Sequence, residues 1–155
     1  RAEGGRLHHV KPHGALYNQA AADPVLIRVI ARAIHAIDPE LLLVILAGPN
    51  AAALTEAAAD EGVQVVLEAF PDRAYERNGA LRARSFEGAV IHDAALAAER
   101  ALHMVDFFFF KQKTAYEIPM QVRSLCVHGD NPNTVALAAA IRSRLESAGV
   151  RIAAV

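Results

Sequence analysis

LLLVILAGPNAAALTEAAADEGVQVVL, residues 41–67, decides the fold class. It contains two continuous apolar runs, Leu41–Leu46 and Val63–Leu67, and neither run alternates with polar residues. Such runs are typical of parallel strands that are buried on both faces. Between them, Gly48–Asn50 predicts a turn and Ala51–Glu61 predicts a helix. A strand, a helix and a strand in this order predict a right-handed crossover unit with a parallel sheet.

The same alternation continues on both sides of this unit. Toward the amino end, Leu7–Val10 predicts a short strand, and Asp23 before Pro24 predicts the N-cap of a helix that Pro39 ends. A long polar connection is expected at Glu68–Glu87. Toward the carboxyl end, the expected elements are a helix capped by Asp93 that runs to about Met104, a strand at Val122–Val127, a helix to Ser147 and a short strand at Val150–Val155.

The composition limits the class of protein. With 155 residues, 54% of them hydrophobic and 21% charged, the chain can bury the core of one domain, which excludes global disorder. A formal net charge of −1 gives no electrostatic footprint for nucleic acid or for an anionic membrane. One cysteine, Cys126, excludes a disulfide framework within the chain and a Cys-rich zinc site. We therefore expect a cytoplasmic protein without nucleic-acid or membrane partners.

Polar residues follow the expected strands, and parallel α/β folds place their sites at the carboxyl ends of strands. The first polar cluster, after Leu7–Val10, contains Lys11, His13, Tyr17 and Asn18. Lys11 could stabilise a developing anion, and His13 could transfer protons near neutral pH. The alternative for this cluster is a solvated turn with one structural histidine.

The second polar cluster contains Glu68, Asp72, Arg73 and Tyr75 and follows Val63–Leu67. Two carboxylates beside one arginine can divide the roles of acid and base. The alternative is a surface ion pair in a loop.

Two further clusters lie later in the chain. Arg82–Arg84 is basic, and the arginine fork suits a carboxylate or a phosphate, although a solvated loop is the alternative. His128 and Asp130 come just before an expected helix N-terminus, which favours anions. His128 could be a base, a ligand or a structural donor. Cys126 is expected to be a small core residue.

One segment, Asp106–Pro119 (DFFFFKQKTAYEIP), breaks the alternation of strands and helices. It resembles foreign sequence fused into an open reading frame, so we treat it as an insert and assign it no function. On this interpretation its phenylalanines pack poorly. The alternative is a buried strand followed by a polar loop.

Four motifs together resemble the LamB/YcsF family. They are VKPHGALYN (Val10–Asn18), EAFPDRAY (Glu68–Tyr75), RSFEGAVIHD (Arg84–Asp93) and CVHGDNP (Cys126–Pro132). The resemblance covers the chain except Asp106–Pro119, and of the basic cluster only Arg84 matches. It implies an α/β fold, a (β/α) barrel of seven parallel strands akin to polysaccharide deacetylase barrels. A barrel typically takes about 250 residues, so we expect one partial barrel domain over residues 1–155, incomplete at its N-terminus.

The resemblance also implies a function, that of the A subunit of a prokaryotic 5-oxoprolinase. This activity is the ATP-dependent opening of 5-oxo-L-proline to L-glutamate, with ATP and Mg²⁺ as co-substrate and the B and C subunits as partners. Alternatives are a metal-dependent carbohydrate deacetylase of related barrel fold, with His13 and His128 as ligands, and an inactive fragment. No metal site is otherwise expected. The expected catalytic residues are Lys11, His13, Glu68, Asp72 and His128, and the expected substrate-binding residues are Tyr17, Asn18, Arg73, Tyr75, Arg84 and Asp130.

Overall fold

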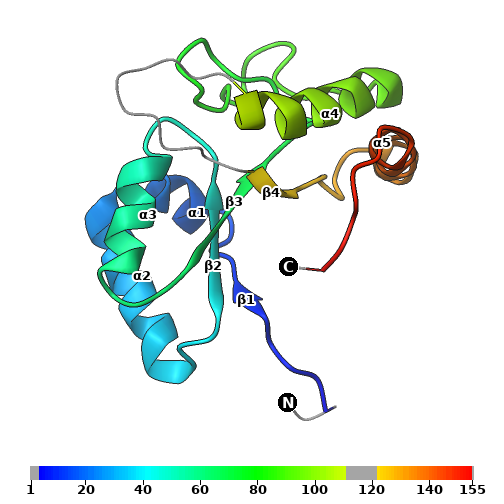
Figure 1. Cartoon of the computed structure of the whole chain (residues 1–155). Helices are drawn as coiled ribbons and strands as arrows, with labels where there is room; N and C mark the ends of the chain where they lie inside the picture. Colours follow the sequence, from blue (N-terminus) through cyan, green and yellow to red (C-terminus); the bar gives the residue numbers. More distant parts are fainter. Residues whose placement is uncertain (1–3, 111–121, 155) are drawn as a thin grey trace. The chain divides into compact units, whose positions relative to one another are not determined.

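The computed structural model describes residues 4–110 and 122–154, in which strands and helices alternate (Figure 1). The described strands form a sheet of four in the order β1-β2-β3-β4, and β1 pairs with β2 in parallel. The α/β class with a parallel sheet is thereby confirmed, while the seven-stranded barrel stays a prediction. The strands are β1 (His9–Val10), β2 (Leu42–Leu46), β3 (Val65–Ala69) and β4 (Val122–Leu125), and the helices are α1 (Ala15–Ala20), α2 (Pro24–Ile37), α3 (Ala51–Ala59), α4 (Ala94–Phe110) and α5 (Thr134–Ser147).

The chain divides into two compact units at the boundary between Leu67 and Glu68. The first unit contains α1, α2 and α3 beside β1 and β2, whose register pairs His9 with Leu42 and Val10 with Leu43 (Figure 1). The second unit contains β4, α4 and α5. The single-domain expectation stays a prediction.

In the first unit, α2 begins as the sequence predicts. The Asp23 carboxylate accepts hydrogen bonds from the backbone N–H groups of Val25 (2.9 Å) and Leu26 (3.2 Å), and Pro24 is the first helical residue. These bonds satisfy donors that the first helical turn leaves free. The buried face of α2 is apolar, and α2 packs against α3. The buried residues are Ile27, Ala31 and Ile34 on α2 and Ala51, Leu54, Ala57 and Ala58 on α3.

The second unit has a small apolar core between α4 and α5. Three buried alanines of α4 meet larger aliphatic side chains of α5, and the small residues let the two helices approach closely. Asp93 caps α4 as predicted, because its carboxylate accepts the backbone N–H of Leu96 at 2.9 Å. The core residues are Ala97, Ala98 and Ala101 on α4 and Leu137, Ile141 and Leu145 on α5.

Helix α4 is longer than the sequence predicts. It continues past Met104 to Phe110, so the first part of the expected insert extends a helix, which is one of the forms expected of a foreign insert and excludes the alternative of a strand at these residues. Four consecutive phenylalanines favour a strand locally, but the helix already formed upstream can propagate through them. Residues 111–119 of the expected insert lie outside the described residues. The predicted poor packing of its phenylalanines therefore stays a prediction.

Strand boundaries differ from the predicted ones, and β1 and β2 begin at His9 and Leu42 rather than at Leu7 and Leu41. β3 begins and ends two residues later than predicted, so Glu68 lies inside the strand rather than after it. β4 ends at Leu125, before the predicted Val127. Val150–Ala154 forms no strand, so that prediction was wrong. Instead, the backbone N–H of Val150 donates to the carbonyl of Leu145 (3.0 Å) and closes the end of α5.

Helix α1 was missed in the sequence. It spans six residues after Gly14, whose φ of 61° lies in the left-handed region that favours glycine. Gly14 is the residue from which α1 begins, in the segment that follows β1. Over residues 4–110 and 122–154, no helix is both long and apolar enough to cross a membrane.

Candidate active site

Asp72 and His128 form the centre of the candidate site in the second unit. Asp72 follows β3 and His128 follows β4, so each lies where a strand of the sheet ends. One carboxylate oxygen of Asp72, Oδ2, accepts the backbone N–H of His128 at 2.9 Å and lies 2.8 Å from Nδ1 of its ring. The sequence placed both residues in the site, but it did not predict that they contact each other.

The surroundings of this pair favour one tautomer of His128. Asp72 is fully buried, and its other oxygen, Oδ1, has no hydrogen-bond partner among the described residues. A buried carboxylate stabilises a donor that faces it, so this contact favours the tautomer with the proton on Nδ1 and the lone pair on Nε2. The ring of Phe70 stacks on that of His128, with centroids 5.2 Å apart and planes at 21°. His128 is thus held from two sides while about a quarter of its side chain stays exposed.

Two arginines fix the loop that carries Asp72. Arg73 donates through Nε to the carbonyl of Ala89 (3.2 Å) and through Nη2 to that of Arg82 (2.6 Å). Arg100, on α4, donates to the carbonyls of Pro71 (3.2 Å) and Arg73 (2.7 Å), which flank Asp72 in the chain. Burial lowers the pKa of Arg73 below its ordinary value. Arg73 therefore supports the loop, and its role in substrate binding stays a prediction.

Arg100 was missed in the sequence, although a signal existed. It lies three residues after Ala97 on the helix face whose other positions are buried alanines. A half-buried arginine on such a face needs acceptors, and here it finds backbone carbonyls.

Glu68 and Tyr75 are also part of this unit. Glu68 is buried inside β3, and the hydroxyl of Ser124 lies 3.5 Å from its Oε1. Tyr75 accepts the backbone N–H of Phe70 at its hydroxyl oxygen (2.9 Å), and burial raises the pKa of Tyr75 to about 12. The segment predicted as a polar connection folds back on itself, because Arg73 bridges to Val90 and Tyr75 to Leu81.

Arg84 and Asp130 form an ion pair at the rim of this unit. Nη1 of Arg84 donates to Oδ2 of Asp130 at 2.6 Å, and both side chains are about half exposed. This hydrogen bond holds the pKa of Asp130 below its ordinary value. Two residues that the sequence assigns to substrate binding are therefore together.

Asn131 fixes the turn after His128 and was not identified from the sequence. It is buried, it donates through Nδ2 to the carbonyl of Ile91 (3.1 Å), and its Oδ1 accepts the backbone N–H of Asn133 (3.1 Å). The same Oδ1 lies 3.2 Å from Nδ1 of His92. These bonds attach the turn to the segment before α4.

The remaining predicted residues belong to the first unit. Nζ of Lys11 lies 5.4 Å from the ring centroid of Tyr17, close enough for a cation–π interaction. His13 is exposed, and the amide of Asn18 lies 3.5 Å from the carbonyl of Gly14. The structure brings Lys11 and Tyr17 together, and convergence with Glu68 or Asp72 stays a prediction.

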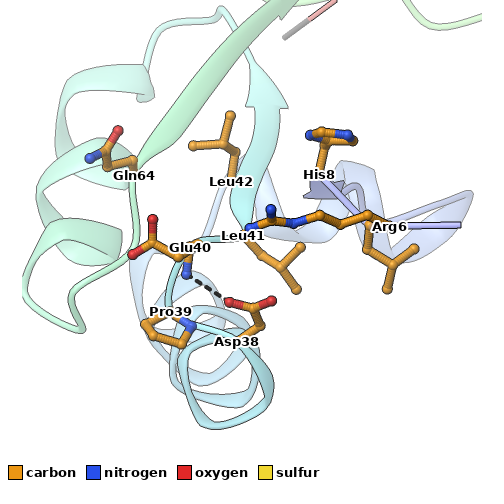
Figure 2. A pocket seen from close by; sticks show the side chains of 9 residues that line it. Arg6, His8, Asp38, Pro39, Glu40, Leu41, Leu42 and Gln64 are labelled. Atoms are coloured by element: carbon orange, nitrogen blue, oxygen red, sulfur yellow. Dashed lines mark hydrogen bonds between the residues drawn. The ribbon is translucent and has the colours of Figure 1, made fainter. Parts of the chain in front are cut away.

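A hollow of about 390 Å³ in the first unit contains none of the predicted residues. Figure 2 shows Arg6 and His8 on one side of it and Asp38 and Glu40 on the other. It lies where β1 and β2 begin, whereas Lys11 follows the end of β1. Within residues 4–110 and 122–154, no three His, Cys, Asp or Glu side chains gather closely enough to hold a metal ion.

The comparisons with known proteins all point to the same family. The chain is 49% identical over 154 residues to the A subunit of a 5-oxoprolinase from Thermus thermophilus and 46% identical over 153 residues to that from Syntrophobacter fumaroxidans, each time over 99% of this chain. The crystal structure of a lactam utilization protein from Thermus thermophilus matches 99% of this chain with a TM-score of 0.80 and 46% identity. The chain spans about 60% of the length of these relatives. The family model for LamB/YcsF matches residues 1–155, and the chain belongs to the LamB/YcsF family.

Proposed function

We propose that the chain acts as part of the A subunit of a cytoplasmic 5-oxoprolinase. The enzyme would open 5-oxo-L-proline to L-glutamate at the expense of ATP, together with the B and C subunits. The names and the identity of the relatives support the reaction class. The order of strands and helices and the match to a lactam utilization protein support an α/β fold for this subunit, and the seven-stranded barrel belongs to the proposal.

The chemistry of a lactam requires proton transfer. Water attacks the carbonyl carbon, the ring C–N bond breaks, and the leaving nitrogen takes a proton as it becomes the amine of glutamate. A group that first accepts a proton from water and then gives one to nitrogen can serve both steps. His128 is our candidate, because Asp72 holds its Nδ1 side and leaves Nε2 for this transfer.

ATP, with Mg²⁺, supplies the driving force when it is bound. The described residues do not fit a phosphate site around Arg73, because its guanidinium is buried and donates to two backbone carbonyls. Lys11, His13 and Glu68 remain candidate catalytic residues, and Tyr17 and Asn18 candidate substrate contacts.

The observation that carries the proposal is the pair of contacts from His128 to one oxygen of Asp72. Its test uses the Thermus thermophilus relative, co-expressed with its partner subunits, and measures ATP-dependent formation of glutamate. Replacing the equivalent of His128 by Gln should lower the rate about 100-fold or more. The equivalent of His103→Gln, an exposed position on α4, is the matched control and should keep the rate. Equal rates in the two variants would contradict the proposal.

A further inference from the structure

Four residues of the second unit form a closed network of hydrogen bonds. The backbone N–H of Ile91 donates to the backbone carbonyl of Asp72 at 2.8 Å, and the carbonyl of Ile91 accepts a hydrogen bond from Nδ2 of Asn131 at 3.1 Å. The backbone N–H of Asn131 donates to the carbonyl of His128 at 3.3 Å, and His128 donates to the carboxylate of Asp72. The closed network therefore contains both members of the pair at the centre of the candidate site.

The closed network joins three segments of the chain. Asp72 follows β3, Ile91 lies before α4, and His128 and Asn131 lie in the turn after β4. The bond between Ile91 and Asp72 joins backbone to backbone, whereas the bond between the turn and Ile91 comes from the side chain of Asn131. Substitution of Asn131 therefore opens the closed network at one known place.

The carboxylate of Asp72 is sensitive to the position of the turn. Its Oδ1 is buried and has no hydrogen-bond partner among the described residues, so the contacts of His128 with Oδ2 decide how the carboxylate is oriented. No second donor at Oδ1 compensates when the turn moves away. The position of the turn thus controls whether Nδ1 of His128 reaches its acceptor.

The amide of Asn131 is itself held in one orientation. Asn131 is buried, and its Oδ1 accepts the backbone N–H of Asn133 at 3.1 Å while its Nδ2 donates to Ile91. Exchanging oxygen and nitrogen would set donor against donor and acceptor against acceptor. Nδ1 of His92 lies 3.2 Å from the same Oδ1. Asn131 is therefore a rigid connection between the turn and the segment before α4.

We propose that Asn131 is a positioning residue for His128. Its bond to the carbonyl of Ile91 holds the turn after β4 at the distance from Asp72 at which Nδ1 of His128 meets the carboxylate. Without this bond the turn moves, and the preference of the neutral imidazole for a proton on Nδ1 weakens. The consequence for catalysis rests on the proposed function, in which His128 transfers protons.

Two variants of the chain test this role through the tautomer of His128, read from the ¹⁵N NMR shifts of its neutral imidazole. Asn131→Ala removes both bonds of the amide. Asn131→Ser keeps a short side-chain oxygen that can accept the N–H of Asn133, but it removes the donor to Ile91. In both variants the ratio of the Nδ1-protonated to the Nε2-protonated form should fall about threefold to tenfold.

The matched control is Asn133→Ala in the same turn. It removes a bond of the same kind, from Nδ2 to the carbonyl of His92 at 3.2 Å, which lies outside the closed network. Its tautomer ratio should equal that of the unaltered chain. An unchanged ratio in Asn131→Ser would overturn the proposal, because Asn131 would then serve the turn alone. An equal fall in Asn133→Ala would also overturn it, because any loosening of the turn would then suffice.

The unaltered chain provides a measurement that needs no variant to fold. The Nδ2 protons of Asn131 should exchange slowly with solvent, because one of them is bonded to the carbonyl of Ile91 in a buried place. The exposed amide of Asn133 should exchange fast. Equally fast exchange of the two amides would refute the closed network.

The glutamate assay separates this inference from the proposed function. In the Thermus thermophilus relative with its partner subunits, the equivalent of Asn131→Ser should lower kcat about threefold to tenfold and leave KM unchanged. If the tautomer ratio falls in the chain while kcat stays, the positioning role stands and the catalytic role of His128 fails. If the tautomer ratio stays, the positioning role is refuted, whatever the assay gives.

Discussion

His128 directs its backbone N–H and its ring Nδ1 at the same oxygen of Asp72, at 2.9 and 2.8 Å. The first contact fixes where the turn after β4 sits, and the second fixes how the ring is oriented. A histidine that is held at one nitrogen exchanges protons at the other, so the arrangement prepares Nε2 for proton transfer.

Stability at high pH should depend on Tyr75. Because burial raises its pKa to about 12, the folded state holds the hydroxyl proton more tightly than the unfolded state, whose tyrosine pKa is about 10. The protonated hydroxyl of Tyr75 therefore contributes to the free energy of unfolding below about pH 10, and this contribution is lost as the pH rises toward about 12. Urea unfolding at a series of pH values should show this decline.

The matched variant is Tyr75→Phe, which has no hydroxyl to titrate. It should lose about 1–3 kcal/mol at neutral pH, because the buried N–H of Phe70 then lacks its acceptor. It should also show a smaller decline above about pH 10. An identical pH dependence in both proteins would show that Tyr75 is not the group responsible.

Arg100→Ala should destabilise the second unit. Arg100 makes two hydrogen bonds to loop carbonyls, and truncation leaves those acceptors unpaired, for a loss of about 1.5–3 kcal/mol in the free energy of unfolding. Arg142→Ala removes an exposed ion pair and should change this free energy by less than about 1 kcal/mol. Equal losses in the two variants, measured by chemical denaturation, would argue against a structural role for Arg100.

Truncation of Leu137 should destabilise the core between α4 and α5. This side chain is fully buried against α4, so Leu137→Ala should cost about 2–5 kcal/mol in the free energy of unfolding. Val135 lies two residues earlier on the same helix and is 84% exposed. Val135→Ala should change stability by about 0.5 kcal/mol or less. A similar melting temperature for both variants would disprove this packing.

Local signals predicted much of the fold. The caps at Asp23 and Asp93 were predictable because a capping carboxylate bonds to N–H groups two or three residues away. The bounds of β3 were not predictable in this way, because pairing with neighbouring strands, rather than the apolar run itself, decides where a strand begins and ends. The apolar residues after Gly149 form no strand, and the first of their N–H groups, that of Val150, closes α5 instead.

The sequence identified several residues of the candidate site but not the hydrogen bonds that connect them. Asp72 and His128 could be singled out because each follows a strand, yet their hydrogen bonds join residues 56 positions apart. Arg100 and Asn131 were missed because their partners are backbone carbonyls and N–H groups, which no side-chain pattern reveals.

The most direct test of the account is the tautomer of His128, read from the ¹⁵N NMR shifts of its imidazole as the pH is raised until the ring is neutral. We expect the proton on Nδ1 and the lone pair on Nε2, because the carboxylate of Asp72 accepts from Nδ1. In Asp72→Asn the preference should weaken or reverse, whereas Asp130→Asn, two residues from His128, should leave it unchanged. A neutral His128 with its proton on Nε2 in the unaltered chain would contradict the account.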